Sequence, residues 1–196
     1  MSNIIEVKNL SFSYDSGAKN AKDAVHDVSF TVGYGEIIGI IGHTGSGKST
    51  LIQHLNGLIR VQKNRGKVVV GEFDLTDKKC DFKKLRAKVG MVFQYPEYQL
   101  FAETVKDDVA FALKNFYPEL KEEEKEDRIR SAIETVGLNY HAVKDRSPFE
   151  LSGGNKRRVA IAGVIVARPE VLILDEPVAG LDPRASASLC RLSTNF

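Results

Sequence analysis

The stretch GHTGSGKST, residues 42–50, decides the fold of this chain. From Gly42 to Ser49 it matches the pattern G-x-x-x-x-G-K-[ST], after an apolar run and before a segment with helical spacing. Glycines in such a loop let backbone N–H groups turn towards phosphate oxygens, and the following helix N-terminus adds a favourable dipole. The stretch therefore predicts a cradle for a nucleoside triphosphate. Its candidate binding residues are Gly42, His43, Thr44, Gly45, Ser46, Gly47, Lys48, Ser49 and Thr50.

A second stretch, VLILDE at residues 171–176, supplies the acidic half of the predicted site. Its four apolar residues predict a buried strand that ends at Asp175, and open α/β sheets bind ligands at the carboxyl ends of their strands. We expect Asp175 and the Ser49 hydroxyl to hold Mg²⁺, and Lys48 to bridge the outer phosphates. Glu176 is placed to polarise an attacking water, as a general base does.

The hydrophobic pattern around these motifs predicts an α/β fold. Alternating apolar residues predict antiparallel strands near the N-terminus, and continuous apolar runs predict strands covered on both faces. The expected strands are residues 3–14, 24–32, 36–42, 65–73, 87–94 and 170–176. Helical spacing follows Lys48, extends from about Thr104 to Gly137, and returns after Gly153. The strand–helix–strand order indicates a core with a helical insertion.

The composition of the chain limits the classes of protein to which it can belong. The 196 residues carry a formal net charge of +2, so no strong basic field favours nucleic acid as a partner. The apolar runs are too short to span a bilayer. Cys80 and Cys190 lie far apart and outside any metal-binding or redox spacing, which favours a reducing cytoplasm.

The stretch LSGGNKRRVAIAG, residues 151–163, carries the family resemblance. Ser152, Gly153 and Gly154 open a helix and predict a second anion-binding terminus. The arrangement resembles ATP-binding cassette ATPases, in which this signature reaches across a head-to-tail dimer to the γ-phosphate of the partner's ATP. The resemblance implies a P-loop NTPase (RecA-like) core with an N-terminal antiparallel β-subdomain and a helical signature subdomain.

The same resemblance assigns further roles. Tyr14 matches the aromatic residue that stacks on adenine, although Phe12 is a nearby competitor. Gln94 matches the glutamine that senses Mg²⁺ and the attacking water, and the loop AGLD, ending at Asp182, matches one that touches the opposing site. The implied single domain has its core at about 1–93 and 157–183, its helical part at about 94–156, and an atypical tail at 184–196.

Five stretches narrow the resemblance further: IGHTGSGKST, VFQYPEYQLFAETVKDDVAF, FELSGG, RRVAIAG and DEPVAGLDP. Together they resemble the second ATPase subunit of energy-coupling factor importers of vitamins or other micronutrients. This implies a sister ATPase, a transmembrane scaffold subunit, a substrate-binding membrane subunit, and a peripheral place on the cytoplasmic side of the membrane. Residues 95–101 would supply part of the groove that receives the scaffold, whereas internal packing is the alternative for Tyr98, Leu100 and Phe101.

The sequence departs from the family pattern at two positions and at its end. Asn155 replaces the usual glutamine, and Val178 the usual threonine. Similar cassettes continue beyond Asp182 with an apolar strand that ends in a histidine, whereas all four histidines here precede the signature. We therefore expect a truncated cassette without its C-terminal core strands. The alternative functions are an inactive truncated cassette and a non-transport cassette ATPase of the DNA-repair or chromosome type.

Overall fold

A computed structural model describes residues 3–14 and 22–176. The chain forms two compact units, Met1–Arg86 and Ala87–Phe196. The predictions for Val178, Asp182 and residues 184–196 lie outside the described residues. The boundaries between core and helical part remain predictions.

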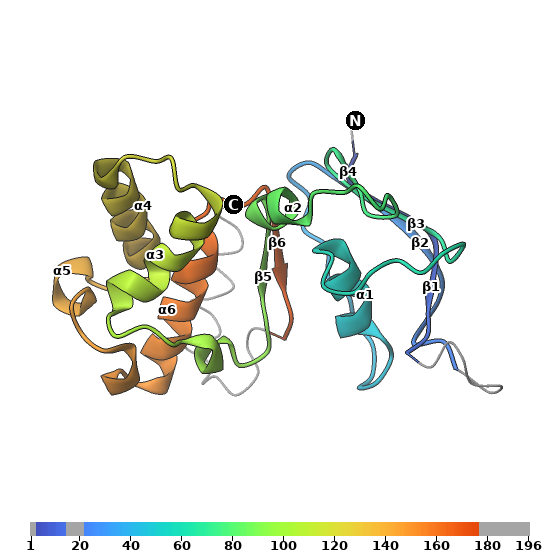
Figure 1. Cartoon of the computed structure of the whole chain (residues 1–196). Coiled ribbons are helices and arrows are strands. Elements are labelled where there is room, and N and C mark those ends of the chain that lie inside the picture. The colour runs from blue at the N-terminus through green and yellow to red at the C-terminus, as the bar shows by residue number, and fades with distance from the viewer. Residues whose placement is uncertain (1–2, 15–21, 177–196) are drawn as a thin grey trace. The chain divides into compact units, whose positions relative to one another are not determined.

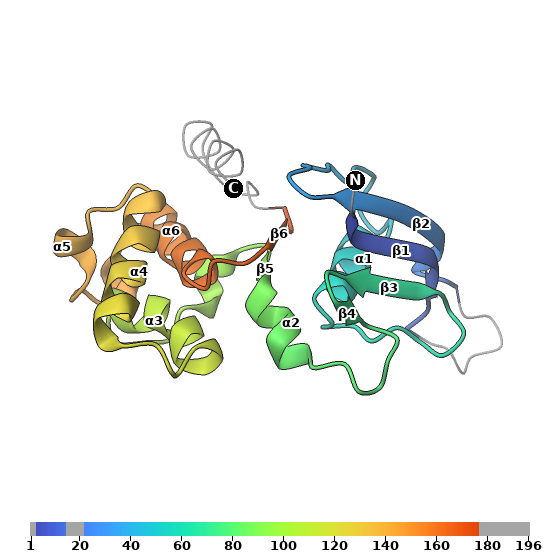
Figure 2. The same ribbon diagram turned by 90° about the horizontal axis from the view of Figure 1, so that it is seen from above.

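The first unit is built on a four-stranded sheet with the order β2-β1-β3-β4, in which all neighbours are antiparallel (Figure 2). The strands are β1 (Asn3–Phe12), β2 (Val25–Gly33), β3 (Lys67–Val70) and β4 (Phe73–Asp74). Ile5 and Val7 of β1 are buried while Glu6 between them is partly exposed, which is the alternation that the sequence predicted. The predicted strand at 65–73 is instead a hairpin, because Gly71 turns the chain at a positive φ of 55°.

Helix α1 (Lys48–Leu55) covers this sheet and is short for a physical reason. Asn56 ends it, and Gly57 follows at a φ of 68°, which glycine adopts without strain. A Cβ atom on Gly57 would lie 2.2 Å from the Phe82 ring at the start of α2 (Phe82–Lys88), so a side chain there has no room. Leu58, which follows Gly57, lies beyond the helix and is half exposed.

The apolar run at residues 36–42 does not form the strand that the sequence predicted. Neither sheet includes this segment, and Ile37, Ile38, Ile40 and Ile41 are exposed, the last to 95%. The prediction is wrong because a continuous apolar run forms a buried strand only where it pairs with neighbouring strands in a sheet whose two faces are covered. In the described part of the chain, no strand pairs with residues 36–42.

The second unit combines a parallel strand pair with a cluster of helices (Figure 1). Strands β5 (Val89–Val92) and β6 (Val171–Leu174) run in parallel register. The helices are α3 (Val105–Phe116), α4 (Glu122–Thr135), α5 (Tyr140–Val143) and α6 (Gly153–Ile165), with 3-10 turns η1 (Pro96–Gln99) and η2 (Pro148–Glu150). Their core is aliphatic, and its most buried members include Leu113, Ile133 and Val159.

Two features of this unit qualify the sequence predictions. The charged run at residues 119–130 falls mostly on α4, where Ile129 is buried and the glutamates of the first turn are exposed, as predicted for a solvated helix face. By contrast, β6 is only partly buried, because β5 is its one strand neighbour among the described residues. The prediction of a fully buried strand is therefore wrong for β6.

Candidate functional site

The loop before α1 closes around its own lysine. The Lys48 ammonium donates hydrogen bonds to the carbonyl oxygens of Gly42 (2.9 Å) and His43 (3.1 Å). Gly45 and Gly47 lie at positive φ, 80° and 88°, which allows the loop to curl in this way. The lysine thus lies within the predicted phosphate loop, where it can exchange two neutral acceptors for anionic phosphate oxygens.

Close packing also requires glycine in this loop. A Cβ atom on Gly47 would lie 2.0 Å from the carbonyl oxygen of Ala24, which is a backbone atom and cannot rotate away. One on Gly42 would lie 2.7 Å from the Ser46 hydroxyl oxygen. The glycines therefore serve the loop's own geometry before any ligand is considered.

Tyr14, rather than Phe12, offers a ring to solvent. Tyr14 is 64% exposed and Phe12 is 8% exposed, and their rings meet edge to face with centroids 4.9 Å apart. The Tyr14 hydroxyl lies 3.0 Å from the Thr50 hydroxyl on α1. Of the two residues that the sequence left open, Tyr14 is the one whose ring is available for stacking.

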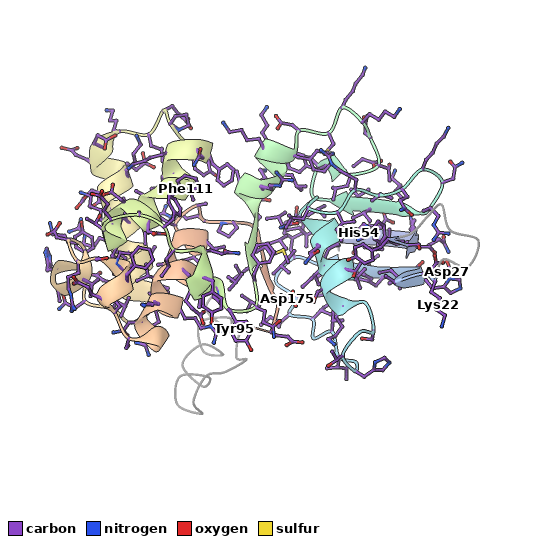
Figure 3. All side chains as sticks on the ribbon, turned by 60° about the horizontal axis from the view of Figure 1, so that its bottom comes forward. Lys22, Asp27, His54, Tyr95, Phe111 and Asp175 are labelled. Carbon is purple, nitrogen blue, oxygen red and sulfur yellow. The ribbon has the colours of Figure 1, made fainter. Side chains whose placement is uncertain are left out.

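Behind these residues lies His54, which the sequence analysis did not single out. Its side chain is fully buried on α1 (labelled in Figure 3), and its ring meets Phe12 edge to face. The Nδ1–H donates to the carbonyl oxygen of Thr50 at 2.7 Å, whereas Nε2 has no hydrogen-bond partner among the described residues. Burial lowers the pKa of His54. Its spacing of three residues from Leu51 was the available signal that it faces inward.

In the second unit, Gln94 and Glu176 meet just beyond the ends of the two parallel strands. The Gln94 Nε2 donates to the Glu176 Oε2 at 3.0 Å. Asp175 is buried, and its backbone N–H continues the β5–β6 ladder by donating to Val92 O at 2.9 Å. Glu176 lies at a φ of 46°, a conformation that is uncommon for residues with a side chain and is found at functional sites. The three predicted residues of this unit are thus close together.

The signature residues form the N-terminus of α6. The Ser152 hydroxyl caps the helix by accepting from the Asn155 N–H at 3.4 Å. Cβ atoms on Gly153 and Gly154 would meet nothing within 4 Å, and neither glycine has a positive φ. Within the described part of the chain, neither packing nor backbone conformation requires glycine at positions 153 and 154. At position 47 both do. Open space above a helix N-terminus suits the close approach of an anionic group from another molecule.

The donor set that the sequence assigned to Mg²⁺ is chemically suited to that ion. Ser49, Gln94 and Asp175 offer a hydroxyl, an amide and a carboxylate oxygen, and Mg²⁺ prefers oxygen ligands and keeps several waters. Ser49 belongs to the first unit and the other two to the second. No group of three or more His, Cys, Asp or Glu side chains that could hold a metal occurs among residues 3–14 and 22–176.

An aromatic surface follows Gln94. Tyr98 is 84% exposed, and Phe101 is also exposed and meets Phe111 of α3 edge to face at 4.9 Å. Tyr95 and Phe111 are labelled in Figure 3. Leu100 is buried, so internal packing accounts for that residue and not for Tyr98 or Phe101. Phe111 was not predicted, because only the fold brings it beside residue 101.

Comparisons with known proteins agree with the motifs. A family model described as ABC transporter matches residues 25–179. The energy-coupling factor transporter ATP-binding protein EcfA2 of Clostridioides difficile (strain 630) is 55% identical over 179 residues, which are 91% of this chain and 61% of the relative. The protein of the same name from Caldanaerobacter subterraneus subsp. tengcongensis is 54% identical over 94% of this chain and 63% of its own length. This chain therefore spans less than two thirds of the length of these relatives.

Solved structures agree as well. The structure of cbiO1 from Clostridium perfringens, part of the ABC transporter complex cbiONQ, has a TM-score of 0.83 at 36% identity and covers all of this chain and 74% of its own. A dimeric, post-hydrolysis structure of the ATP-binding cassette MJ0796, bound to ADP and Pi, has the same TM-score at 27% identity, with coverage of 96% and 81%. The predicted fold class and the family resemblance are confirmed.

Proposed function

The chain belongs to the ABC transporter family, and from that premise we propose that it binds ATP and hydrolyses it to energise a membrane importer of the energy-coupling factor type, which takes up vitamins or other micronutrients. The observation that carries the proposal is the loop at residues 42–50, which holds the Lys48 ammonium on two backbone carbonyls in front of α1. The Lys48 ammonium can exchange these neutral carbonyl acceptors for anionic phosphate oxygens, because attraction between opposite charges then adds to the hydrogen bond.

Two groups of residues would share the chemistry. Lys48 and the loop N–H groups bind the phosphates, while Tyr14 stacks on the adenine ring. Ser49, Gln94 and Asp175 would hold the Mg²⁺ that accompanies ATP, whose charge offsets that of the terminal phosphates. These residues neutralise and orient the nucleotide.

Glu176 would act on the attacking water. Its carboxylate already accepts a hydrogen bond from Gln94 at 3.0 Å, so the two side chains can orient one water between an acceptor and a donor. We assign Glu176 the role of general base and Gln94 that of positioning the water and the metal. Lys48 stabilises the charge that develops on the phosphoryl oxygens.

The signature would act in a dimer, where it would contact the nucleotide of the partner. Ser152, Gly153 and Gly154 cap α6 with free space in front of them, which fits a γ-phosphate presented by a partner. The active form would be a head-to-tail dimer with a sister ATPase. A scaffold subunit in the membrane would dock on the aromatic surface of Tyr95, Tyr98 and Phe101, and a separate membrane subunit would bind the transported substrate.

This arrangement places the chain at the cytoplasmic face of a membrane, as a peripheral subunit. Among the described residues, no helix is long and apolar enough to cross a bilayer. We further propose that the cassette is one domain whose core combines residues from about 1–93 and 157–183 around a helical part at about 94–156.

Lys48→Ala tests the central assignment. Loss of a charge-assisted contact of about 1.5–3 kcal/mol weakens ATP binding about 10- to 100-fold. Binding is measured with a fluorescent ATP analogue, with circular dichroism melting to show that the variant is folded. Lys63→Ala is the matched control, since Lys63 is an exposed lysine of the same unit outside the loop. Equal ATP affinity of Lys48→Ala and the unaltered chain would contradict the proposal.

A further inference from the structure

A buried arginine lies just after the signature on α6. Arg157 is 2% exposed, although it is one of three consecutive basic residues, Lys156, Arg157 and Arg158. Its neighbours on the chain are both partly exposed. Arginine is almost never fully buried unless it is paired, so the position calls for an explanation.

The guanidinium of Arg157 contacts the segment that follows Gln94. Its Nε lies 3.5 Å from Oε2 of Glu97, which belongs to the short helix η1. Its Cζ lies 5.9 Å from the centroid of the Tyr95 ring, within reach of a cation–π interaction. Tyr95 is the residue immediately after Gln94, and it takes a left-handed conformation with a φ of 54° at the start of η1. The Arg157 side chain thus lies against both Tyr95, which precedes η1, and Glu97 within it.

Stability alone does not explain this pair. Arg157 is buried, whereas the side chain of Glu97 is 20% exposed. Taking the Arg157 charge out of water costs much of what its attraction to Glu97 returns, and replacing such an ion pair by apolar groups of similar size is often neutral or stabilising. Methionine has an unbranched stem like that of arginine, so Arg157→Met removes the charge and keeps an apolar side chain of similar length. Such a pair is better explained by a role in fixing the position of two elements relative to each other than by a role in stability.

We propose that Arg157 is a positioning residue that holds η1, and with it Gln94, in register with the Ser152–Gly154 end of α6. The proposal rests on the proposed function, since it gives both elements their roles at the nucleotide. Gln94 contacts Glu176 on one side, and Tyr95 follows it directly on the other.

Hydrogen exchange of the whole chain, followed by mass spectrometry, tests this directly. The variants are Arg157→Met, Glu97→Gln and the double variant, which removes both charges of the pair. Arg158→Met is the matched control, because Arg158 lies on the same helix and donates instead to the Gly137 carbonyl at 3.3 Å. Peptides that cover residues 94–100 and 151–155 report on the two elements, and peptides from α3 and α4 report on the rest of the unit.

The double variant is expected to melt within about 4 °C of the unaltered chain. Exchange is expected to rise at least about fivefold in both reporting segments and to stay unchanged in α3 and α4. Arg158→Met is expected to leave residues 94–100 unchanged. The proposal is overturned if neither segment exchanges faster, or if exchange rises throughout the unit with a large fall in melting temperature, because that pattern describes ordinary packing.

Steady-state ATP turnover separates this proposal from the function on which it rests. If the unaltered chain turns over ATP, the double variant should lose at least about fivefold in kcat with an unchanged KM, because the phosphate loop is untouched. A change in KM alone would overturn the positioning role. If the unaltered chain fails to bind or hydrolyse ATP, the proposed function fails, and the exchange pattern still decides whether Arg157 holds the two elements in register.

Discussion

The phosphate loop and the Gln94–Glu176 pair are built in opposite ways. The loop takes all its functional groups from one short run of sequence, and its shape follows from glycine conformations and backbone carbonyls. The pair joins side chains 82 residues apart, which only the parallel register of β5 and β6 brings together. The first kind of site depends on local backbone geometry, and the second depends on tertiary packing.

Glu176→Gln gives the largest expected effect, which is a loss of ATP turnover. It changes only the Gln94–Glu176 pair and leaves the phosphate loop unaltered. Loss of a general base lowers ATP turnover about 10²- to 10⁴-fold. The new amide still offers an oxygen to Gln94, and the phosphate contacts remain, so ATP binding should persist. Turnover and binding are measured on the same preparation. Glu170→Gln, at the other end of β6, should retain normal turnover because Glu170 pairs with Lys88. Normal turnover in Glu176→Gln would assign the base to another residue.

Tyr14→Ala is expected to weaken ATP binding about 5- to 150-fold, from about 1–3 kcal/mol for stacking of a base on an aromatic ring. Tyr14→Phe keeps the ring and its edge-to-face contact with Phe12 and loses only the bond to Thr50, so its effect should be several times smaller. Titration with ATP and with inorganic triphosphate separates base from phosphate contacts. Equal weakening of both ligands by Tyr14→Ala would exclude a stacking role.

Two glycines extend the comparison from the phosphate loop to the signature. Gly47→Ala must strain a left-handed residue and displace the Ala24 carbonyl, so we expect a loss of about 1–3 kcal/mol in the free energy of unfolding. Gly153→Ala meets nothing within 4 Å and should stay within about 0.5 kcal/mol. Urea denaturation followed by circular dichroism measures both. Similar losses in the two variants would mean that the free space at the signature is occupied.

The smallest expected effect is a pH dependence from His54. Burial lowers the pKa of His54 in the folded state. As the pH falls below 6.5, the ordinary pKa of histidine, the unfolded chain therefore protonates His54 before the folded chain does. The contribution of this residue to stability is therefore complete above pH 6.5 and is lost as the pH decreases. Urea titrations at several pH values should show this slope. The slope should disappear in His54→Gln and remain in His141→Gln, since His141 is exposed.

The sequence predicted what depends on local pattern. The loop at 42–50, the N-terminal antiparallel strands and the helices α3, α4 and α6 follow from glycine spacing and hydrophobic period, and the structure contains them. The burial of residues 36–42 and of β6 could not be predicted in this way, because burial depends on which strands lie alongside. The Arg157–Glu97 pair could not be predicted either. A basic run next to the signature is typical of a solvated surface, and only the fold buries one of its residues.

The exposed isoleucines at residues 37–41 are expected to promote aggregation of the chain. The segment IIGII carries no charge and no proline, and its side chains are exposed. No strand among residues 3–14 and 22–176 pairs with the backbone of this segment. Short apolar segments with unpaired backbone groups are templates for β pairing between molecules. Aggregation of the isolated chain should therefore rise with its concentration and begin in this segment. A charged residue at Ile41, whose side chain is the most exposed of the four, is the substitution that would interrupt it.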